Sequence, residues 1–241
     1  MTIYPLIAGL LIACAICGCS TRLPTYPAMS DEASLALIAD RQATVQRIVA
    51  ECDINLTDAD GQSVTLEGVL VARPPGNVRL RAWKFGHAVF DLTLVDGKGW
   101  IIIPEQGPGA HQLNVTNMPA SRVSEALDLL GPLYFRSAKP VGGDNMMLLA
   151  AGPALGRDNV LCEVQRRTLT PRRFVVHAGS DLPPSELLLD QYAVVDDNVW
   201  PMRIRLRGKS GGVLLRLRNV EINGEIAPTA FVPPKRAKAL P

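Results

Sequence analysis

Residues 202–218 read MRIRLRGKSGGVLLRLR, and this stretch decides the fold class. Apolar side chains alternate with arginines on both sides of a turn at 208–212. Because successive strand residues point to opposite faces, the pattern predicts a β-hairpin with one buried apolar face and one basic face. The basic face could meet anionic lipid head groups or simply keep the sheet soluble. The apolar positions are Met202, Ile204, Leu206, Leu215 and Leu217.

The same kind of pattern extends outward in both directions. From Ile54 onward, short runs rich in Val, Leu and Ile are divided by turn signals, and the run Trp100 to Ile103 ends at a proline. We expect four or five strands in that part and about six more after residue 146. The turn signals are Asp60-Gly61, Pro74-Pro75-Gly76, Phe85-Gly86-His87 and Asp96-Gly97.

Two segments have helical rather than strand periodicity. Ser30 precedes two acidic residues and an apolar recurrence that predicts an amphipathic helix over roughly 31–51. A second helix is expected from Pro119 to Leu130, with proline near its start and Gly131-Pro132 after its end.

The order of these elements predicts a mainly β protein with two to three helices. A sheet of about 10–11 antiparallel strands rarely stays flat, so we expect it to curl into an open half-barrel whose concave face the helices cover. Nothing inside 30–236 demands a second domain, and a basic C-terminal tail is expected at 237–241.

The first residues have the character of a lipoprotein signal peptide, expected to span 1–18. Their apolar stretch, Leu6 to Ile16, is too short to span a bilayer, and it leads into Ile16-Cys17-Gly18-Cys19-Ser20, which resembles the bacterial lipobox. Cys19 would then carry a diacylglycerol and begin the mature chain, followed by a proline-stiffened tether over 19–29. The usual Lys or Arg before the apolar core is missing.

The composition of the chain limits the kinds of molecule that it is expected to bind. A net charge of +2 gives no reason to expect nucleic acid, whereas membrane lipid, reached through Cys19, fits a lipid-bearing protein. Cys52 and Cys162 could form a disulfide in an oxidising compartment, but both stand in apolar surroundings where buried free thiols are common.

Several strings, in this order, resemble the LolA/LolB family of periplasmic lipoprotein carriers and receptors. The resemblance covers roughly 31–236 of a chain that also has a lipobox, as the outer-membrane receptor does. The strings are Glu67 to Pro74, with its terminal Arg-Pro; Val78 to Arg81; Lys84-Phe85-Gly86; Val89 to Leu94; Trp100 to Pro104; Trp200 to Ile204; and Thr229 to Pro234.

The resemblance implies an apolar cup for the acyl chains of lipoproteins, with helices as a lid. It implies that Phe85, before glycine on a hairpin, matches the receptor's membrane-contacting residue and that Arg73 matches the arginine of the lid latch. Phe85 and the nearby Trp83 could contact membrane or cargo or could simply pack on the neighbouring strand, and Arg73 could be a solvated arginine at a strand end. The partners would be acylated lipoproteins or lipids and a soluble LolA-like carrier. We expect a monomer in the cell envelope, anchored at the outer membrane and facing the periplasm.

We expect a binding protein and not an enzyme. His87, His111 and His177 have no partner at metal-ligand spacing, and the sequence has no nucleophile elbow or phosphate loop, so neither a metal nor a cofactor is expected beyond the lipid of Cys19. One alternative stays open. The same fold could serve a structural or adaptor lipoprotein that holds an envelope protein without transferring lipid, in which case the cup could be filled by side chains.

Overall fold

The structure is a computed structural model that describes residues 22–104, 127–154, 157–177, 184–209 and 211–240. Two antiparallel meanders make up almost all of it. The first contains β1 (Ile48–Thr57), β2 (Ser63–Arg73), β3 (Asn77–Lys84), β4 (His87–Val95) and β5 (Lys98–Ile102). The second contains β6 (Lys139–Gly143), β7 (Met147–Ala154), β8 (Arg157–Gln165), β9 (Thr170–Val176), β10 (Ser185–Val195), β11 (Asn198–Gly208) and β12 (Gly211–Ile222).

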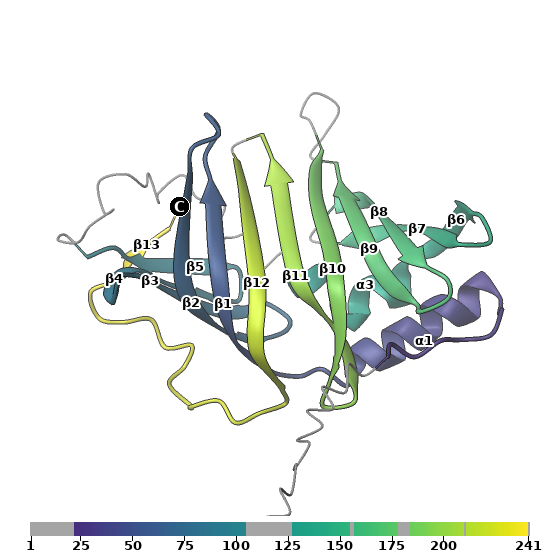
Figure 1. Cartoon of the computed structure of the whole chain (residues 1–241), viewed down its shortest axis with the longest axis horizontal. Helices are drawn as coiled ribbons and strands as arrows, with labels where there is room; N and C mark the ends of the chain where they lie inside the picture. The colour runs from purple at the N-terminus through teal and green to yellow at the C-terminus, as the bar shows by residue number, and fades with distance from the viewer. Residues whose placement is uncertain (1–21, 105–126, 155–156, 178–183, 210, 241) are drawn as a thin grey trace, which may run out of the picture.

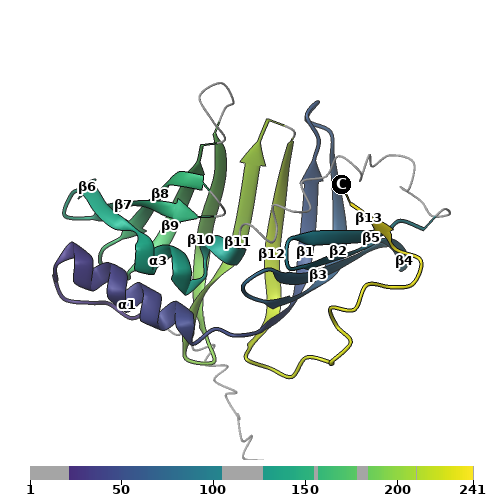
Figure 2. The same ribbon diagram turned by 180° about the vertical axis from the view of Figure 1, so that it is seen from behind.

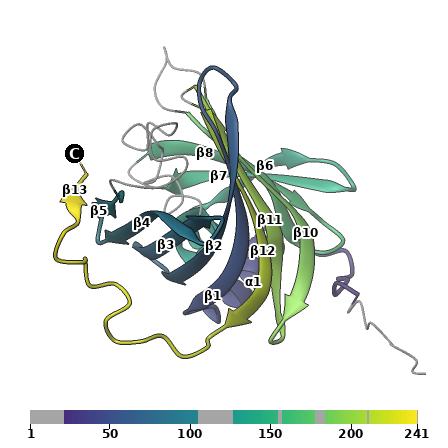
Figure 3. The ribbon, with the colours of Figure 1, turned by 60° about the vertical axis from the view of Figure 1, so that its left-hand side comes forward.

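The two meanders join into one open sheet through the pairing of β1 with β12. A short last strand, β13 (Lys238–Ala239), extends it beyond β5, so the order is β13-β5-β4-β3-β2-β1-β12-β11-β10-β9-β8-β7-β6. In the views of Figures 1 and 2 the sheet curves strongly, and Figure 3 shows β2 to β5 turning away from the wall formed by β1 and β10 to β12. The predicted open half-barrel is therefore confirmed.

The hairpin that decided the fold class forms β11 and β12. Ile204 pairs with Leu215 and Leu206 with Val213, and all four side chains are buried on the concave side. On the other side the arginines meet carboxylates of neighbouring strands: Arg203 Nη2 donates to Asp190 Oδ2 at 2.7 Å, and Arg218 forms an ion pair with Asp53 at 3.0 Å. These pairs favour the solubilising interpretation of the basic face.

Helix α1 (Asp31–Ala43) starts where the sequence predicted, with the Ser30 hydroxyl accepting from the amide of Ala33 at 3.1 Å. Its predicted end at about residue 51 is wrong, because β1 begins at Ile48. The apolar residues after α1 follow the strand period instead: Ile48, Ala50, Cys52, Ile54 and Leu56 are all buried. A β-rich neighbourhood that supplies pairing partners on both sides outweighs a local helical spacing.

Helix α3 (Pro132–Ser137) was not predicted as a helix. The predicted helix over 119–130 lies largely outside the described residues, although 127–129 are helical and Leu127, Leu129 and Leu130 are buried. In Figure 2, α1 and α3 lie together on the concave side, against the half of the sheet that contains β6 to β10.

The described residues form thirteen strands, more than the predicted ten or eleven, and the two unforeseen strands are the edge strands. The sequence of β6, KPVGG, has the composition of a turn, yet an edge strand tolerates proline and glycine because one side of it needs no ladder hydrogen bonds. Lys238 and Ala239, from the segment expected to be a basic tail, form β13 against Ile101 and Trp100.

Candidate functional site

The concave face of the sheet is a continuous apolar wall. Rows of side chains run across several strands. In one row each residue pairs with the next on the adjacent strand, in the order Ile204, Leu215, Ile54 and Leu66. In another row Leu80 lies between Leu70 and Leu92. Each of these side chains is at most 2% exposed. Such a wall is the kind of surface that hydrocarbon would contact, and in this structure it is covered.

The structure also has a cavity of about 800 Å³, which is lined by residues other than those of this wall. It lies between α3, the C-terminal end of α1, the residues leading into β1 and the β2–β3 turn. Its size is within the range of small-molecule binding sites, and most of its lining groups are apolar or backbone. The described residues that line it are Ala43, Val45, Gln46, Arg47, Arg73, Pro74, Pro75, Asp128, Gly131, Pro132, Leu133, Tyr134, Ser137 and Pro153.

Tyr134 fixes α3 at the side of this cavity. Its hydroxyl lies 3.0 Å from the carbonyl oxygen of Ala150 and 2.9 Å from that of Val160, and its ring meets Phe135 and Phe174 edge to face. Burial raises the pKa of this phenol far above its usual range, so it stays protonated as a donor. Tyr134 could not be singled out from the sequence, because its hydroxyl bonds to backbone carbonyls of two other strands, which no side-chain pattern reveals.

The β2–β3 turn is joined to residue 128 across the mouth of the cavity. The amide of Gly76 donates to Asp128 Oδ1 at 2.9 Å, and residues 127–129 are the described end of the predicted second helix. Arg73, the predicted latch, lines the cavity, but its guanidinium stacks on Phe231 of the C-terminal segment, 5.3 Å from the ring centroid. The β2–β3 turn is therefore joined to the end of the predicted second helix through Asp128 rather than through Arg73.

Phe85 is the most exposed large apolar residue described, at 82%. It occupies the two-residue turn between β3 and β4, away from the residues that line the cavity. Trp83 is half-buried on β3, and the guanidinium of Arg81 lies 5.4 Å from its ring centroid. Phe85 is thus exposed at the tip of its hairpin, whereas Trp83 lies against Arg81 of its own strand.

Cys52 and Cys162 are free and buried. They lie on β1 and β8, which four strands separate, so the disulfide that the sequence left open is not formed. Burial raises the pKa of Cys52 to about 12, with a smaller contribution from Asp53, and raises the pKa of Cys162 as well. Both thiols are therefore protonated at neutral pH and poorly reactive.

The remaining predicted features can be placed briefly. Cys19 and His111 lie outside the described residues. Within the described ranges, no group of three or more His, Cys, Asp or Glu side chains is arranged to hold a metal ion. In that same part of the chain, no helix combines the length and apolar character needed to cross a membrane.

Comparison with solved structures identifies the fold. A DUF1329 family protein from Desulfovibrio piger superimposes with a TM-score of 0.61 at 13% identity, covering 83% of this chain and 95% of that one. A LolA superfamily protein from Nitrosomonas europaea gives 0.56 at 11% identity, covering 85% and 98%. A domain from Vibrio parahaemolyticus, provisionally described as an outer membrane lipoprotein-sorting protein domain, gives 0.53 at 12% identity, covering 84% and 97%.

Neither a family model nor a curated protein matches the sequence itself. The chain therefore has the fold of LolA superfamily proteins, an open antiparallel barrel with helices in its concave side, as the resemblance of its sequence strings predicted.

Proposed function

We propose that this protein is a lipid-anchored binding protein that takes the acyl chains of lipoproteins, or of another diacyl lipid, into its apolar cup and passes them to the outer membrane. The observation that carries the proposal is the cavity of about 800 Å³ between α3, the end of α1 and the β2–β3 turn, together with the apolar wall of the concave face. The fold it shares with a LolA superfamily protein and with a domain described for lipoprotein sorting supports the same role.

The chemistry of such a role is burial and release rather than bond making. Each methylene removed from water contributes about 0.8 kcal/mol, so an acyl chain is held by apolar surface alone, without a nucleophile or a metal. Release then requires only that the lipid be more stable in the bilayer than in the cup. We accordingly propose a binding protein rather than an enzyme.

In this proposal the cavity is what remains open of a closed cup, because the apolar wall is covered. Admitting more than one long chain would require the segment that includes Asp128, or the helices α1 and α3, to move away from the wall. Anchoring through Cys19 would place the body at the periplasmic surface of the outer membrane, where a soluble LolA-like carrier could deliver cargo to the monomer.

Native mass spectrometry of the chain from Thr21 onward, made without its own lipid, tests the proposal directly. The protein is mixed with a triacylated lipopeptide and, separately, with the unacylated peptide. We expect a 1:1 complex with the acylated form only. Binding of neither peptide would contradict the cup and favour the adaptor alternative, in which the same fold holds a protein partner.

A matched pair of substitutions on α1 locates the binding site. Ala43 lines the cavity and is half-buried, whereas Ala36 is exposed on the same helix. Ala43→Trp should fill part of the cavity and weaken lipopeptide binding about tenfold, the equivalent of about 1.4 kcal/mol. Ala36→Trp adds the same side chain elsewhere and should leave binding unchanged. Equal binding by both variants would place the acyl chains outside this cavity.

A further inference from the structure

The N-terminal segment is docked on the body rather than free as a tether. The amide of Tyr26 donates to the carbonyl oxygen of Arg167, in the β8–β9 turn, at 2.9 Å. The Tyr26 hydroxyl accepts from Arg41 of α1 at 3.4 Å, and Tyr26 and Met29 pack against the core. The predicted tether over 19–29 is therefore held from Tyr26 onward, and the body has a fixed point from which the chain leads to Cys19.

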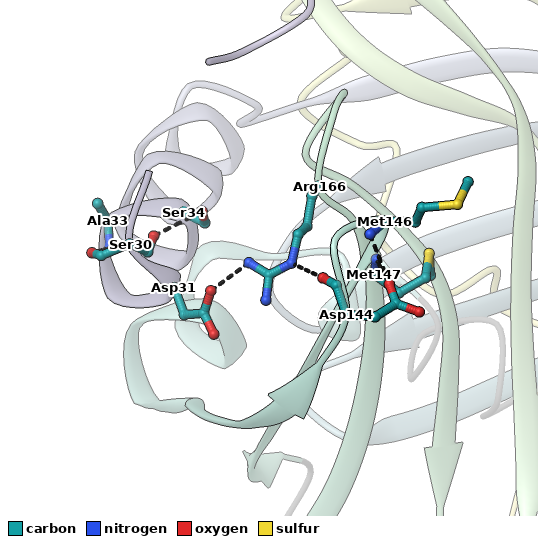
Figure 4. Close-up of polar contacts among 8 residues, drawn as sticks. All are labelled: Ser30, Asp31, Ala33, Ser34, Asp144, Met146, Met147 and Arg166. Carbon is teal, nitrogen blue, oxygen red and sulfur yellow. Dashed lines mark hydrogen bonds and ion pairs between the residues drawn. The ribbon is translucent and has the colours of Figure 1, made fainter. Parts of the chain in front are cut away.

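The β6–β7 turn lies beside this fixed point and is tightly held. Asp144 Oδ1 accepts from the amides of Met146 and Met147, each at 2.7 Å, and the amide of Arg166 donates to the carbonyl oxygen of Met146 at 2.9 Å. The Arg166 guanidinium also bridges Asp31 at the start of α1 and the carbonyl oxygen of Asp144 (Figure 4). Residues of the docked segment and of both turns line one cavity of about 540 Å³.

This turn and the adjoining strand β6 each present an apolar side chain to solvent. Met146 is 70% exposed and points away from Arg166 in Figure 4, and Val141, on the edge strand β6, is 58% exposed. Exposed apolar groups on a turn held by several hydrogen bonds contribute little to folding, but they suit insertion among lipid tails.

The directions of the strands place Phe85 at one rim of the sheet, formed by strand ends, and the β6–β7 turn at the opposite rim. Because every pair in the sheet is antiparallel, the β2–β3, β6–β7 and β8–β9 turns share one rim, here named the tether rim, while the β1–β2, β3–β4 and β11–β12 turns share the other. Figure 1 agrees, since β1 and β11 point toward the second rim and away from α1. The β2–β3 turn, which borders the large cavity, belongs to the tether rim.

Chain length decides which rim can face the membrane that holds the anchor. Six residues lie between Cys19 and Tyr26, so these two residues are at most about 25 Å apart when the chain is fully extended. Phe85, next to β3, lies six strand spacings from β9 and the turn that holds Tyr26, about 29 Å across the sheet, and also at the other end of its strands. If the rim that carries Phe85 rested on the bilayer, the lipid of Cys19 could not reach that bilayer.

We infer that the tether rim, with Met146 at its tip, is the surface that rests on the membrane anchoring this protein, and that Phe85 faces away from it toward the arriving cargo or its carrier. The inference rests on the proposed lipid on Cys19. It directs the β2–β3 turn beside the cavity toward the bilayer, so acyl chains would have a short path from cup to membrane.

Fluorescence of the full lipidated chain on phosphatidylcholine vesicles tests the orientation. Met146→Cys and Phe85→Cys are each labelled with a polarity-sensitive dye, and Val232→Cys, an exposed apolar position on the C-terminal segment, serves as a matched control. The buried thiols of Cys52 and Cys162 should not react, which labelling of the unsubstituted protein verifies. Far-UV circular dichroism confirms that the labelled variants are folded.

We expect nitroxide-bearing lipids to quench the dye at position 146 at least twofold, with a blue shift of its emission, and to leave positions 85 and 232 unchanged.

Two other outcomes are informative in different ways. If the protein floats with the vesicles but the dye at 146 stays in water, or if the dye at 85 is quenched instead, the orientation is wrong while the anchor stands. If the purified full-length protein carries no lipid and does not float, the anchor is wrong and the orientation falls with it. Lipopeptide binding by the cup is measured separately and is independent of both results.

Discussion

Phe85 occupies a backbone conformation that suits other residues better. The turns β3–β4, β4–β5 and β10–β11 each have two residues with positive φ, as in type I′ hairpins. The first positions of the latter two turns are Asp96 and Asp196, residue types that tolerate this region, whereas β3–β4 has Phe85 at φ +52°. An exposed aromatic side chain at a strained position is better explained by contact with another molecule than by stability of the fold.

Replacing Phe85 by Asn should therefore separate stability from function. Phe85→Asn creates the Asn-Gly pair that type I′ turns prefer and should raise the free energy of unfolding by about 1 kcal/mol, while lowering the rate at which lipopeptide is received from a carrier. Denaturant unfolding and a transfer assay measure the two effects. Asp96→Asn is the matched control, in which neither quantity should change appreciably. A less stable Phe85→Asn protein would contradict this account of the turn.

The amide of Gly76 donates a hydrogen bond to Asp128, whereas the sequence had indicated Arg73, three residues before Gly76, as the latch. The Arg-Pro string indicated Arg73, but the guanidinium of Arg73 stacks on Phe231. The hydrogen bond to Asp128 could not be predicted, because its donor is a backbone amide, which every residue except proline has. The role of Arg73 in a lid stays a prediction, and the hydrogen bond to Asp128 provides a competing candidate that can be tested against it.

Asp128→Ala removes the acceptor of this hydrogen bond and should ease opening of the cavity. A net loss of about 1 kcal/mol corresponds to about fivefold faster uptake of a fluorescent lipopeptide, measured by stopped flow. Arg73→Ala should leave the uptake rate near that of the unsubstituted protein, because the Gly76 amide is unaffected. The reverse ranking of the two variants would restore Arg73 as the latch.

For the strands and helices, the spacing of apolar residues in the sequence predicted the interiors of strands well and their ends poorly. Alternation predicted β11 and β12 correctly: Ile204, Leu206, Val213, Leu215 and Leu217 are buried, and Met202 is half-buried against the core. It failed after α1, where the spacing of Val45, Ile48 and Val49 fits a helix as well as a strand and only pairing with β2 and β12 decides between them. It failed also for β6, because an edge strand need not have strand-forming residues.

The β6–β7 turn should loosen in acid. Hydrogen bonding and charge from Arg166 lower the pKa of Asp31, and the amides of Met147 and Met146 lower that of Asp144. Because both carboxyls have depressed pKa values in the folded protein, the stabilisation they give is complete above the usual aspartate value of about 3.9 and is lost as the pH falls through the lowered values.

Hydrogen exchange measures this effect on the right atoms. Between pH 6 and pH 3, and after correction for the intrinsic exchange rate, protection of the Met146 and Met147 amides should fall, whereas that of amides in the paired β1–β12 region should not. Asp144→Asn should show reduced protection already at pH 6. Unchanged protection of both methionine amides down to pH 3 would contradict a role for Asp144 in holding the turn.

The open sheet that makes up the molecule has two edges, and their edge strands could not be predicted from the sequence. The count of elements and their order were enough to predict a curled antiparallel sheet with helices on its concave side. They could not show how each edge is closed, because edge contacts depend on chain segments that are distant in sequence. One edge ends in β6, with a proline and two glycines, and the other is covered by β13.

The segment expected to be a free basic tail takes part in this second edge. Lys238 and Ala239 pair with β5, and the amide of Leu240 donates to the carbonyl oxygen of Gly99 at 2.8 Å. Leu240 also packs so closely on Gly99 that a side chain at residue 99 would begin 2.9 Å from its Cδ1 atom. The glycine thus provides the space into which the end of the chain folds.

Ending the chain at Arg236 should uncover β5 and make the protein both less stable and more prone to associate. Loss of the β13–β5 pairing, of the Leu240 hydrogen bond and of the partial burial of Leu240 should lower the free energy of unfolding by about 1–2 kcal/mol, and the unpaired edge should promote self-association. Denaturant unfolding and light scattering measure these changes. Lys238→Glu alters the charge of the same segment but keeps β13, so it should leave both quantities near those of the full chain. If Lys238→Glu matched the truncated protein, charge rather than strand pairing would be the contribution of this segment.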